Sequence, residues 1–534
     1  MDKIDCLLIG HNQITGLKCE RTSRVMWGRN SQFYKEAVTL RYIKYEDQLY
    51  TPTQISNKFT QKKNGESSFE HLSYEPTLNG AIAYLGSYLN KSGFTFDFIN
   101  CLKSEQDKLA SILKRNELHA VAISTSMYTT IFPILEAIAF IKKHNASVKI
   151  VIGGSFIANQ VREQEEAELQ QMFGVIGADV YIYSNEGEHT LVKVLRAIKE
   201  MSPYTDINNI FYKDLGKYSF TFPEEEKIGL DDNLINWNLF EGNQYKYVNV
   251  RTTVSCPFSC AFCGYPKYGG KYRQLSIEAL EKQLNMIREN PKVKGIYFID
   301  DTFNFPAERF KNILRMMIKN KYNFKWHSFF RCQYADRETV ELMKESGCQV
   351  VYCGIESANQ VILDNMNKNT TVEQYKKGIS LLNEYGIANI ASIIIGFPGE
   401  TYQTYLDTYN FIEELGPTFF RSHVWYADAE SPIYSKKKLY KLEESGYEWS
   451  HSTMDAKTAA TLTDLMFLNI KNSVYDSDYP IAFDLLVKGY SIEQIKKFIN
   501  GFNMCMKKGL NAPILAEADY QYIQEMKSAL GSLN

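Results

Sequence analysis

The sequence has almost no net charge, because 60 lysine and arginine residues face 62 aspartate and glutamate residues, which leaves -2 at pH 7. Such a balance gives no reason to expect nucleic acid or an anionic membrane as a partner. A long hydrophobic run is also missing. Residues 121–141 are the most apolar stretch, yet Pro133, Glu136 and several hydroxyl side chains argue against a membrane span.

The first residues, MDKIDCLLIGH, contain acidic side chains and an apolar run that is too short for a secretory signal. Ten cysteines without an evident disulfide framework fit a reducing compartment. We therefore expect a cytoplasmic protein. With 534 residues and 44% hydrophobic content, the chain is long enough for two or three domains with real cores.

The sequence also lacks a second cysteine pair, which bears on the one cysteine motif it has. Cys256, Cys260 and Cys263 form a CxxxCxxC pattern directly after an apolar, β-branched run. Structural zinc normally takes four protein ligands in paired sets, and His327 and His423 are distant single residues. Three thiolates on an iron–sulfur cubane leave one iron open for another ligand. The triplet therefore favours a cluster over zinc, and the other seven cysteines are interpreted as reduced thiols without a metal.

This motif resembles the signature of the radical S-adenosylmethionine (SAM) enzymes, and Phe262, just before the last cysteine, matches its usual aromatic residue. The resemblance implies that the amino and carboxylate groups of SAM chelate the open iron. It also implies an external electron donor of the flavodoxin or ferredoxin type.

From residue 248 to about 435, apolar strands alternate with helices as six βα units, which make three quarters of a barrel. Helix starts are indicated by Ser276, Pro306, Asp336 and a capping box of Thr371 with Gln374. The expected strands lie near 248–254, 294–300, 324–330, 349–354, 389–395 and 420–426.

In a barrel of this kind, chemistry is expected at the carboxyl ends of the strands. Asp301 follows the second expected strand, Arg331 the third, Glu356 and Ser357 the fourth, and Gly396 the fifth. Each has an ordinary structural explanation on its own, such as a helix cap for Asp301. Their common location nevertheless favours one site.

The segments GIES (354–357) and GFPGET (396–401) resemble the SAM-binding strand ends of the radical SAM family. The resemblance implies that Glu356 accepts hydrogen bonds from the ribose hydroxyls or the ammonium of SAM, and that Arg331 pairs with a carboxylate. Gly396 would let the backbone approach the methionine moiety. The candidate SAM-binding residues are Phe262, Asp301, Arg331, Glu356, Ser357 and Gly396.

The N-terminal part shows a similar alternation, with an apolar strand at 4–9 and strand–helix repeats from 79 to 199, which predicts a doubly wound parallel sheet. The expected strand ends carry small or hydroxyl side chains, and together they look like the cobalamin-binding domain found at the N-terminus of one class of radical SAM enzymes. The candidate cobalamin-binding residues are His11, Ser124, Thr125, Ser126, Met127, Tyr128, Gly153, Gly154, Ser155, Asn185, Glu186 and Gly187.

One departure from the cobalamin pattern concerns His11. Cobalamin proteins that ligate cobalt through a histidine use an Asp-x-His-x-x-Gly loop after the first strand, whereas no aspartate stands two residues before His11. We therefore expect His11 to be a capping or binding-site residue rather than a cobalt ligand.

The predicted domains are a Rossmann-like cobalamin-binding domain at 1–200 with an insertion at about 13–76, a linker at 201–247, a radical SAM partial barrel at 248–435 and a helical C-terminal domain at 436–534. The opening IGHN, the segment IDDTFN (299–304) and WSHSTMD (449–455) resemble the cobalamin-dependent radical SAM P-methyltransferases of phosphinothricin-type biosynthesis. For His451 an ordinary capping role is equally compatible with the sequence.

These features predict a cobalamin-dependent radical SAM methyltransferase that acts on an unactivated carbon or a phosphinate phosphorus of a natural-product precursor, either a small molecule or a peptide. As the resemblance implies, a reduced [4Fe-4S] cluster cleaves SAM to a 5'-deoxyadenosyl radical, and the substrate radical takes methyl from methylcobalamin. A second SAM then remethylates cobalamin.

Three alternatives remain open. A radical SAM enzyme can use cobalamin for a rearrangement without methylation. A radical SAM methylthiotransferase also carries GIES and GFPGET, but it needs a second N-terminal cluster, here from Cys6, Cys19 and Cys101. Cys6 lies inside an apolar strand, where a buried thiol is the usual role. The third alternative is a non-catalytic cobalamin- or zinc-binding module, and iron and cobalt analysis would distinguish these classes.

Overall fold

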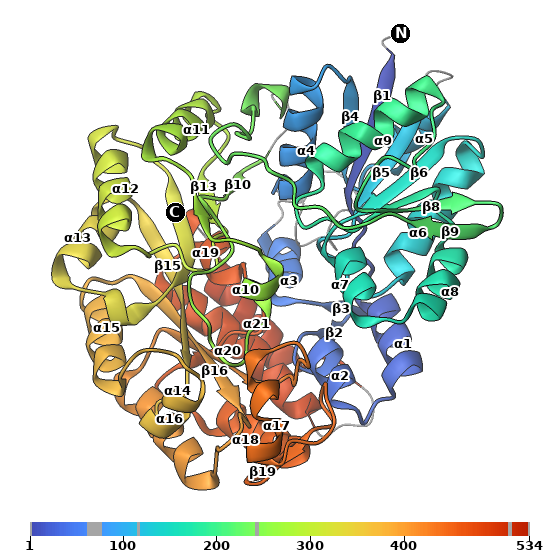
Figure 1. Ribbon diagram of the computed structural model, residues 1–534. Helices are drawn as coiled ribbons and strands as arrows, with labels where there is room; N and C mark the ends of the chain where they lie inside the picture. The colour runs from blue at the N-terminus through green and yellow to red at the C-terminus, as the bar shows by residue number, and fades with distance from the viewer. Residues whose placement is uncertain (1–2, 61–76, 115–117, 241–244, 511–514, 532–534) are drawn as a thin grey trace. The chain divides into compact units, whose positions relative to one another are not determined.

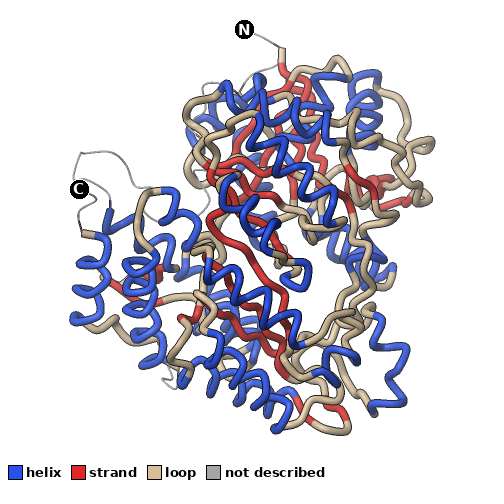
Figure 2. The backbone as a smooth tube through the Cα atoms, turned by 90° about the vertical axis from the view of Figure 1, so that its left-hand side faces the viewer, coloured by secondary structure: helices blue, strands red, loops and turns tan. Residues whose placement is uncertain are grey.

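The computed structural model describes residues 3–60, 77–114, 118–240, 245–510 and 515–531. The chain divides into two units and contains two seven-stranded sheets (Figure 1). Unit 1 comprises 1–14, 74–249 and 275–293, and unit 2 comprises 15–73, 250–274 and 294–534. In both sheets the strands are flanked by helices (Figure 2), so the α/β class predicted from the sequence is confirmed.

Unit 1 is built on a sheet of order β4-β1-β5-β6-β7-β8-β9. Because β1 lies between β4 and β5, the winding of the chain reverses there, and ligands of doubly wound sheets bind at such a switch point. The five parallel strands are β1 (Ile4–His11), β4 (Phe96–Cys101), β5 (Leu118–Ser124), β6 (Lys149–Gly153) and β7 (Val180–Ile182). The helices between them are α4 (Gly80–Lys91), α5 (Gln106–Leu113), α6 (Phe132–His144), α7 (Ser155–Glu163), α8 (Glu166–Ile176) and α9 (Glu188–Glu200).

Part of the segment expected as a linker is folded into unit 1. Strands β8 (Ile210–Asp214) and β9 (Lys217–Phe220) extend the sheet antiparallel to β7. Farther along, the Glu226 carboxylate accepts hydrogen bonds from the Thr190 hydroxyl at 2.6 Å and from the backbone N–H of His189 at 2.8 Å. Glu226 therefore caps the first turn of α9, and the acidic run of the sequence has a structural role.

The second sheet has the order β10-β13-β14-β15-β16-β17-β20, and all of its strands except β10 belong to unit 2. The six strands expected from the sequence are β10 (Tyr247–Val250), β13 (Gly295–Phe298), β14 (Lys325–Phe330), β15 (Cys348–Glu356), β16 (Ala388–Ile395) and β17 (Phe419–Val424). A seventh, β20 (Val474–Tyr475), pairs in parallel with β17 and was not predicted. The covering helices of the repeat are α12 (Ala307–Lys319), α13 (Arg337–Glu345), α14 (Gln360–Asn365), α15 (Val372–Glu384) and α16 (Tyr402–Leu415).

Local capping signals in the sequence agree with the structure. Ser276 caps α11 (Ile277–Glu289), a helix that belongs to unit 1 by its contacts. Asp336 caps α13, and Thr371 with Gln374 forms the expected capping box of α15. Pro306 is the N-cap of α12 and not its first helical residue, which is a shift of one position from the prediction.

The segment after β1, predicted as an insertion at about 13–76, packs with unit 2 and not with the sheet of unit 1. Two long-range contacts hold it: Thr53 N–H donates to Asp478 at 2.9 Å, and Lys488 Nζ donates to the Asn57 side-chain oxygen at 3.1 Å. Its elements are α1 (Gly16–Trp27), α2 (Gln32–Tyr34), a π-helix (Lys35–Thr39), a hairpin of β2 (Ile43–Tyr45) with β3 (Gln48–Tyr50), and α3 (Pro52–Thr60).

The last part of the chain is largely helical, as predicted, and it also contributes a short hairpin to unit 2. That hairpin joins β18 (Ser450–His451) to β19 (Met454–Asp455). The helices are α17 (Lys437–Tyr440), α18 (Ala456–Asn469), α19 (Ile481–Val487), α20 (Ile492–Gly509) and α21 (Tyr520–Leu530). In the part of the chain that the structure describes, no helix has both the length and the apolar character needed to cross a bilayer.

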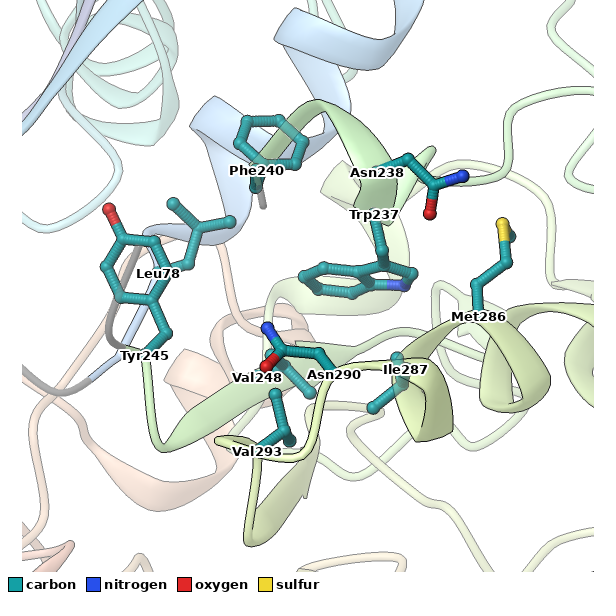
Figure 3. Close-up of a pocket in the computed structure, with 10 residues that line it drawn as sticks. All are labelled: Leu78, Trp237, Asn238, Phe240, Tyr245, Val248, Met286, Ile287, Asn290 and Val293. Carbon is teal, nitrogen blue, oxygen red and sulfur yellow. The ribbon is translucent and has the colours of Figure 1, made fainter. Parts of the chain in front are cut away.

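Unit 1 contains a small apolar cavity between α11, β10 and the turn at Trp237–Phe240 (Figure 3). Its volume is about 20 Å³, which is room for about one water molecule. Trp237 and Met286 lie on opposite sides of Asn238 in the view of Figure 3. A cavity of this size has no room for a substrate, and the candidate site lies at the strand ends.

Candidate functional site

The three-cysteine loop is fixed at both of its ends. It begins after β11 (Thr253–Val254), which pairs antiparallel with β12 (Arg273–Gln274) beyond the loop. In its middle, Ala261 N–H donates to the Met366 carbonyl at 2.8 Å and the Ala261 carbonyl accepts from Ile433 N–H at 2.9 Å. Backbone contacts to two distant segments therefore hold the loop in place.

The sulfur atoms of Cys256 and Cys260 lie beside residues that follow β13 and β14. Cys256 Sγ is 3.6 Å from Thr302 Oγ1, and Cys260 Sγ is 3.9 Å from Arg331 Nη1. Burial, together with the neighbouring Cys260 and Cys256 thiols, raises the pKa of Cys263 to about 11. Such thiols deprotonate when they bind a cationic iron centre.

Among the described residues, no group of three His, Cys, Asp or Glu side chains is close enough to hold a single metal ion. A cubane places each thiolate on a different iron, so it does not require three sulfur atoms to converge on one point. The donor set, three thiolates on one anchored loop, has the soft-ligand chemistry that an iron–sulfur cluster requires.

Asp300 and Asp301 have different surroundings although they are adjacent. Buried Asp300 accepts hydrogen bonds at 2.7 Å from Thr252 N–H, Thr252 Oγ1 and Thr253 N–H, which fixes the chain just before the cysteine loop. The Asp301 side chain interacts with Tyr265, and desolvation raises the pKa of Asp301 to about 6. Asp300 is thus a structural residue, and Asp301 remains the ligand candidate.

Arg331 lies directly against the cysteine loop. The sequence had predicted only that Arg331 lies at a strand end. Its guanidinium carbon is 3.7 Å from the centre of the Phe258 ring, and its Nη2 donates to the Lys368 carbonyl. The Asn304 side chain accepts from Arg331 N–H and donates to the Arg331 carbonyl, each at 2.9 Å. With these contacts the guanidinium has one fixed position beside Cys260, and a cation–π contact adds to its stabilisation.

Glu356 forms a buried ion pair that the sequence did not reveal. Lys368 Nζ is 3.0 Å from Glu356 Oε1, and both side chains are at most 10% exposed. Lys368 Nζ also lies 5.3 Å from the centre of the Phe262 ring, so this aromatic residue of the cysteine motif contacts the same pair. Since Oε1 is engaged by Lys368, the other carboxylate oxygen is the one positioned for a ligand.

Ser357 and Gly396 also have contacts of their own. Ser357 is fully buried, and its hydroxyl lies 3.3 Å from Thr408 Oγ1 on α16, so it joins β15 to a helix. Gly396 has a φ of +92°, and a Cβ there would stand 2.5 Å from Trp449 Cη2. Only glycine fits this combination of backbone angle and close approach.

The Gly396 peptide is held on both sides. Its N–H donates to the buried Glu400 carboxyl group, and burial raises the pKa of Glu400 to about 8. Its carbonyl lies 3.0 Å from His451 Nε2, and the His451 ring stacks on Trp449 with 5.1 Å between ring centres. The C-terminal hairpin therefore supports the GFPGET loop, which gives His451 a role as a positioning residue.

In unit 1, the candidate residues lie at the carboxyl ends of β1, β5, β6 and β7. Thr125 N–H and Oγ1 both donate to the Gly153 carbonyl, at 2.7 and 2.8 Å, which joins the ends of β5 and β6. Gly154 has a φ of +110°, and a Cβ there would come within 2.9 Å of Ser126 N. The exposed candidates at this edge are Ser126, Met127, Ser155 and Asn185; those that are half-buried or buried are His11, Ser124, Thr125, Tyr128, Gly153, Gly154, Glu186 and Gly187.

His11 ends β1 and is buried, and burial lowers its pKa to about 4. Asn79 Oδ1 caps α4 by accepting from Ala81 N–H at 2.9 Å, which directs Asn79 Nδ2 to His11 Nδ1 at 3.3 Å. The amide donates, so Nδ1 is the acceptor and the neutral ring carries its proton on Nε2. That His11 is a binding-site residue rather than a cobalt ligand stays a prediction.

The fold and site define a two-domain α/β protein in which an anchored three-thiolate loop lies at the strand ends of one sheet. Residues 250–412 match the Radical SAM superfamily, and residues 75–194 match the B12 binding domain. The chain therefore combines a radical SAM domain with a B12-binding domain, as cobalamin-dependent radical SAM enzymes do. The predicted cofactors, a [4Fe-4S] cluster with SAM and cobalamin, follow from these two domains.

Three relatives have different activities in their names. An uncharacterized methyltransferase of Pyrococcus horikoshii is 27% identical over 314 residues, which are 58% of this chain and 66% of the relative. An anaerobic magnesium-protoporphyrin IX monomethyl ester cyclase of Rubrivivax gelatinosus is 24% identical over 452 residues and 79% of each chain. A ribosomal protein uS12 methylthiotransferase of Clostridioides difficile is 25% identical over 293 residues, 51% of this chain and 58% of the relative.

Two solved structures share the fold. The cobalamin-dependent S-adenosylmethionine radical enzyme OxsB has a TM-score of 0.60 at 16% identity, over 86% of this chain and 78% of its own. The radical S-adenosylmethionine methyltransferase TsrM of Kitasatospora setae has a TM-score of 0.53 at 17% identity, over 66% of this chain and 71% of its own. At these identities the likeness concerns the fold alone.

Proposed function

We propose that the protein is a cobalamin-dependent radical SAM methyltransferase. The observation that carries this proposal is that one chain holds both a B12-binding domain and a radical SAM domain. In the radical SAM domain the cysteine loop contacts Arg331, and Arg331 donates to the Lys368 carbonyl. The Lys368 side chain in turn pairs with Glu356. A methyltransferase relative and the fold shared with a methyltransferase support the transferred group. The acceptor is a carbon or a phosphinate phosphorus, as the phosphinothricin-type resemblance suggests.

When bound, the cluster with SAM supplies hydrogen-atom abstraction and cobalamin supplies a methyl group. The residues of this chain bind and orient these groups. Arg331 presents a fixed guanidinium to a carboxylate, Glu356 presents its second oxygen to hydroxyl or ammonium donors, and Gly396 allows close approach of the backbone. Asp301 remains a further candidate SAM contact. The aromatic side chains Phe258 and Phe262 exclude water around these groups.

We also propose that the substrate is a small molecule or a peptide, that a flavodoxin- or ferredoxin-type protein supplies the electron, and that the enzyme works in the cytoplasm. A methylthiotransferase would need a second cluster. Cys6 is fully buried in β1, and burial raises its pKa to about 12. Cys101 ends β4 and pairs with His11 of β1, whereas Cys6 pairs with Phe96, five residues earlier on β4. Cys19 belongs to the other unit. This arrangement does not favour a second site.

Methyl transfer is tested by the fate of a labelled methyl group. With deuterated-methyl SAM and the correct substrate, we expect a labelled product, with 5'-deoxyadenosine and S-adenosylhomocysteine formed in equal amounts per turnover. Mass spectrometry of all three compounds measures this. The cyclase-named relative makes a non-methylating reaction the second candidate. Product formation with 5'-deoxyadenosine, but without label or S-adenosylhomocysteine, would establish that candidate in its place.

The state of cobalamin gives an independent prediction. Because the chain lacks the Asp-x-His-x-x-Gly loop, we expect bound cobalamin with its own base displaced and no histidine on cobalt. The cob(II)alamin EPR spectrum should show no nitrogen superhyperfine splitting, and His11→Ala should leave the spectrum unchanged. A nitrogen splitting that disappears in His11→Ala would show that the ring does ligate cobalt.

A further inference from the structure

Unit 2 contains a second group of polar side chains beside the strand that leads to Gly396. Arg421 and His423 are two residues apart on β17, so both point to the same face of the sheet. The register pairs Arg421 with Ser392 and His423 with Ile394, two residues before Gly396. The π-helix Lys35–Thr39 brings Glu36 to them, with Glu36 Oε2 at 4.0 Å from His423 Nδ1.

The charges of Arg421 and Glu36 act on each other, but no ion pair within 4.0 Å joins these two described side chains. Among the described residues, Arg421 forms no ion pair within 4.0 Å, and its buried Nε has no hydrogen-bond acceptor. Glu36 accepts a hydrogen bond from the Gln32 amide at 2.9 Å, and burial raises its pKa. The nearest lysine, Lys35, is paired with Asp464. A buried charge of either sign is costly unless it is paired, so each of the two favours a ligand of opposite charge.

Asp476 is a second carboxylate whose charge acts on Arg421, but it forms no ion pair with Arg421 within 4.0 Å. Asp476 is fully buried and accepts a hydrogen bond from the Tyr352 hydroxyl at 2.9 Å, and burial raises its pKa to about 6. His423 stays neutral, because burial and the Arg421 charge lower its pKa to about 3. His423 therefore offers a ring nitrogen for a hydrogen bond and adds no positive charge.

Three aromatic rings pack together, and one of them lies near Glu36. Phe33, Tyr426 and Tyr447 contact one another edge to face, with ring centres 4.9 Å apart for Phe33 and Tyr447 and 5.2 Å apart for Tyr426 and Tyr447. Tyr447 lies near both Glu36 and Arg421, since these charges act on its pKa in opposite directions. Aromatic faces next to a carboxylate stabilise an ammonium group.

We propose that Glu36, Arg421 and His423 bind an amino acid head group of the substrate. Arg421 takes the carboxylate, and the ammonium donates to Glu36 Oε2 and His423 Nδ1. These two acceptors are 4.0 Å apart, so one nitrogen can reach both at an ordinary hydrogen-bond length of about 2.8 Å. A π-helix is a rare element that recurs at functional sites, and here it supplies Glu36. The inference rests on the proposed function only in that the substrate lies near the Gly396 loop.

The test measures binding to the full-length protein by isothermal titration calorimetry and does not need turnover. The twenty L-amino acids are screened first by thermal shift. The tightest binder is then compared with its N-acetyl derivative, which lacks the ammonium, and with its amide, which lacks the carboxylate. Each derivative should bind about 10-fold or more weakly, because each loses one charge-assisted contact.

Two variants assign the two halves of the head group. Glu36→Gln should weaken binding of the amino acid by about 10-fold and leave the affinity for the N-acetyl derivative unchanged. Arg421→Gln should also weaken binding of the amino acid by about 10-fold, and it should leave the affinity for the amide unchanged. Glu373→Gln and Arg315→Gln make the same chemical changes at exposed positions, and they should bind like the wild type. Circular dichroism verifies that each variant is folded.

Failure of all twenty amino acids to bind would overturn the proposal. Equal affinity for the amino acid and its N-acetyl derivative would also overturn it, because that result would indicate an anion site on Arg421 alone. Both comparisons use the wild-type protein, so they hold even if a variant does not fold. Iron content and SAM binding are measured on the same samples. Loss of amino acid binding with both of these intact contradicts this inference, whereas absence of iron contradicts the proposed function.

Discussion

Replacing Cys256, Cys260 and Cys263 together by alanine is expected to remove the bound iron and to abolish SAM cleavage. Each thiolate holds one iron of the cluster, and the loop that carries all three is anchored by backbone contacts of Ala261 that alanine substitutions do not touch. The fold should therefore survive while the metal is lost. Iron and acid-labile sulfide per chain, together with 5'-deoxyadenosine formation under reducing conditions, measure the two effects.

A matched control replaces Cys6, Cys19 and Cys101 by alanine. These are the thiols that a methylthiotransferase would use for a second cluster, and Cys6 and Cys101 are buried in the sheet of unit 1. The control should retain all of its iron. A four-iron signal in the first triple variant would refute the cluster assignment, and loss of iron in the control would favour the methylthiotransferase alternative.

Much of the fold could be predicted because its signals are local. The strands of both sheets are short apolar runs, and helix starts at Asp336 and Thr371 depend on side chains within three residues of the cap. The cysteine loop is likewise a local pattern. Strand ends in a parallel sheet gather at one edge, so Arg331 and Glu356 could be assigned to one site without knowledge of any contact.

The remaining features depend on contacts between distant residues. Thr53 and Asp478, 425 positions apart, hold the segment after β1 on unit 2, and no local pattern indicates this pairing. Strand β20 has only two residues and exists because it adds to the edge at β17. Lys368 follows no motif, yet it pairs with Glu356 and its carbonyl accepts from Arg331. Lysine is almost always exposed, so its sequence position gave no signal.

The role of His451 in the hairpin also could not be predicted from the sequence. The sequence left a capping role and a functional role equally open, and the structure shows a contact from Nε2 to the Gly396 carbonyl at 3.0 Å. The Trp449 ring, which would clash with any Cβ at residue 396, explains why that loop requires glycine. Both facts join segments more than 50 residues apart, so they follow from the fold and not from either motif.

Lys368→Met is expected to destabilise unit 2 by about 3 kcal/mol, because it leaves the Glu356 carboxylate buried without its partner. Lys376→Met, at an exposed pair with Glu373, is the matched control and should change stability by less than about 0.5 kcal/mol.

Glu356→Gln removes the charge and should weaken SAM binding by about 10-fold or more if Glu356 contacts SAM. Urea unfolding and equilibrium dialysis of SAM against iron-loaded protein provide the measurements.

The double variant Glu356→Gln with Lys368→Met separates stability from binding. No unpaired charge remains in it, so part of the lost stability should return relative to Lys368→Met alone. SAM affinity should stay low, since the carboxylate that we propose as a SAM contact is still absent. Arg331→Lys keeps the positive charge but loses the planar fork, so it should also weaken SAM binding while iron content holds. Wild-type SAM affinity in the double variant and in Arg331→Lys would mean that these buried groups serve only the fold.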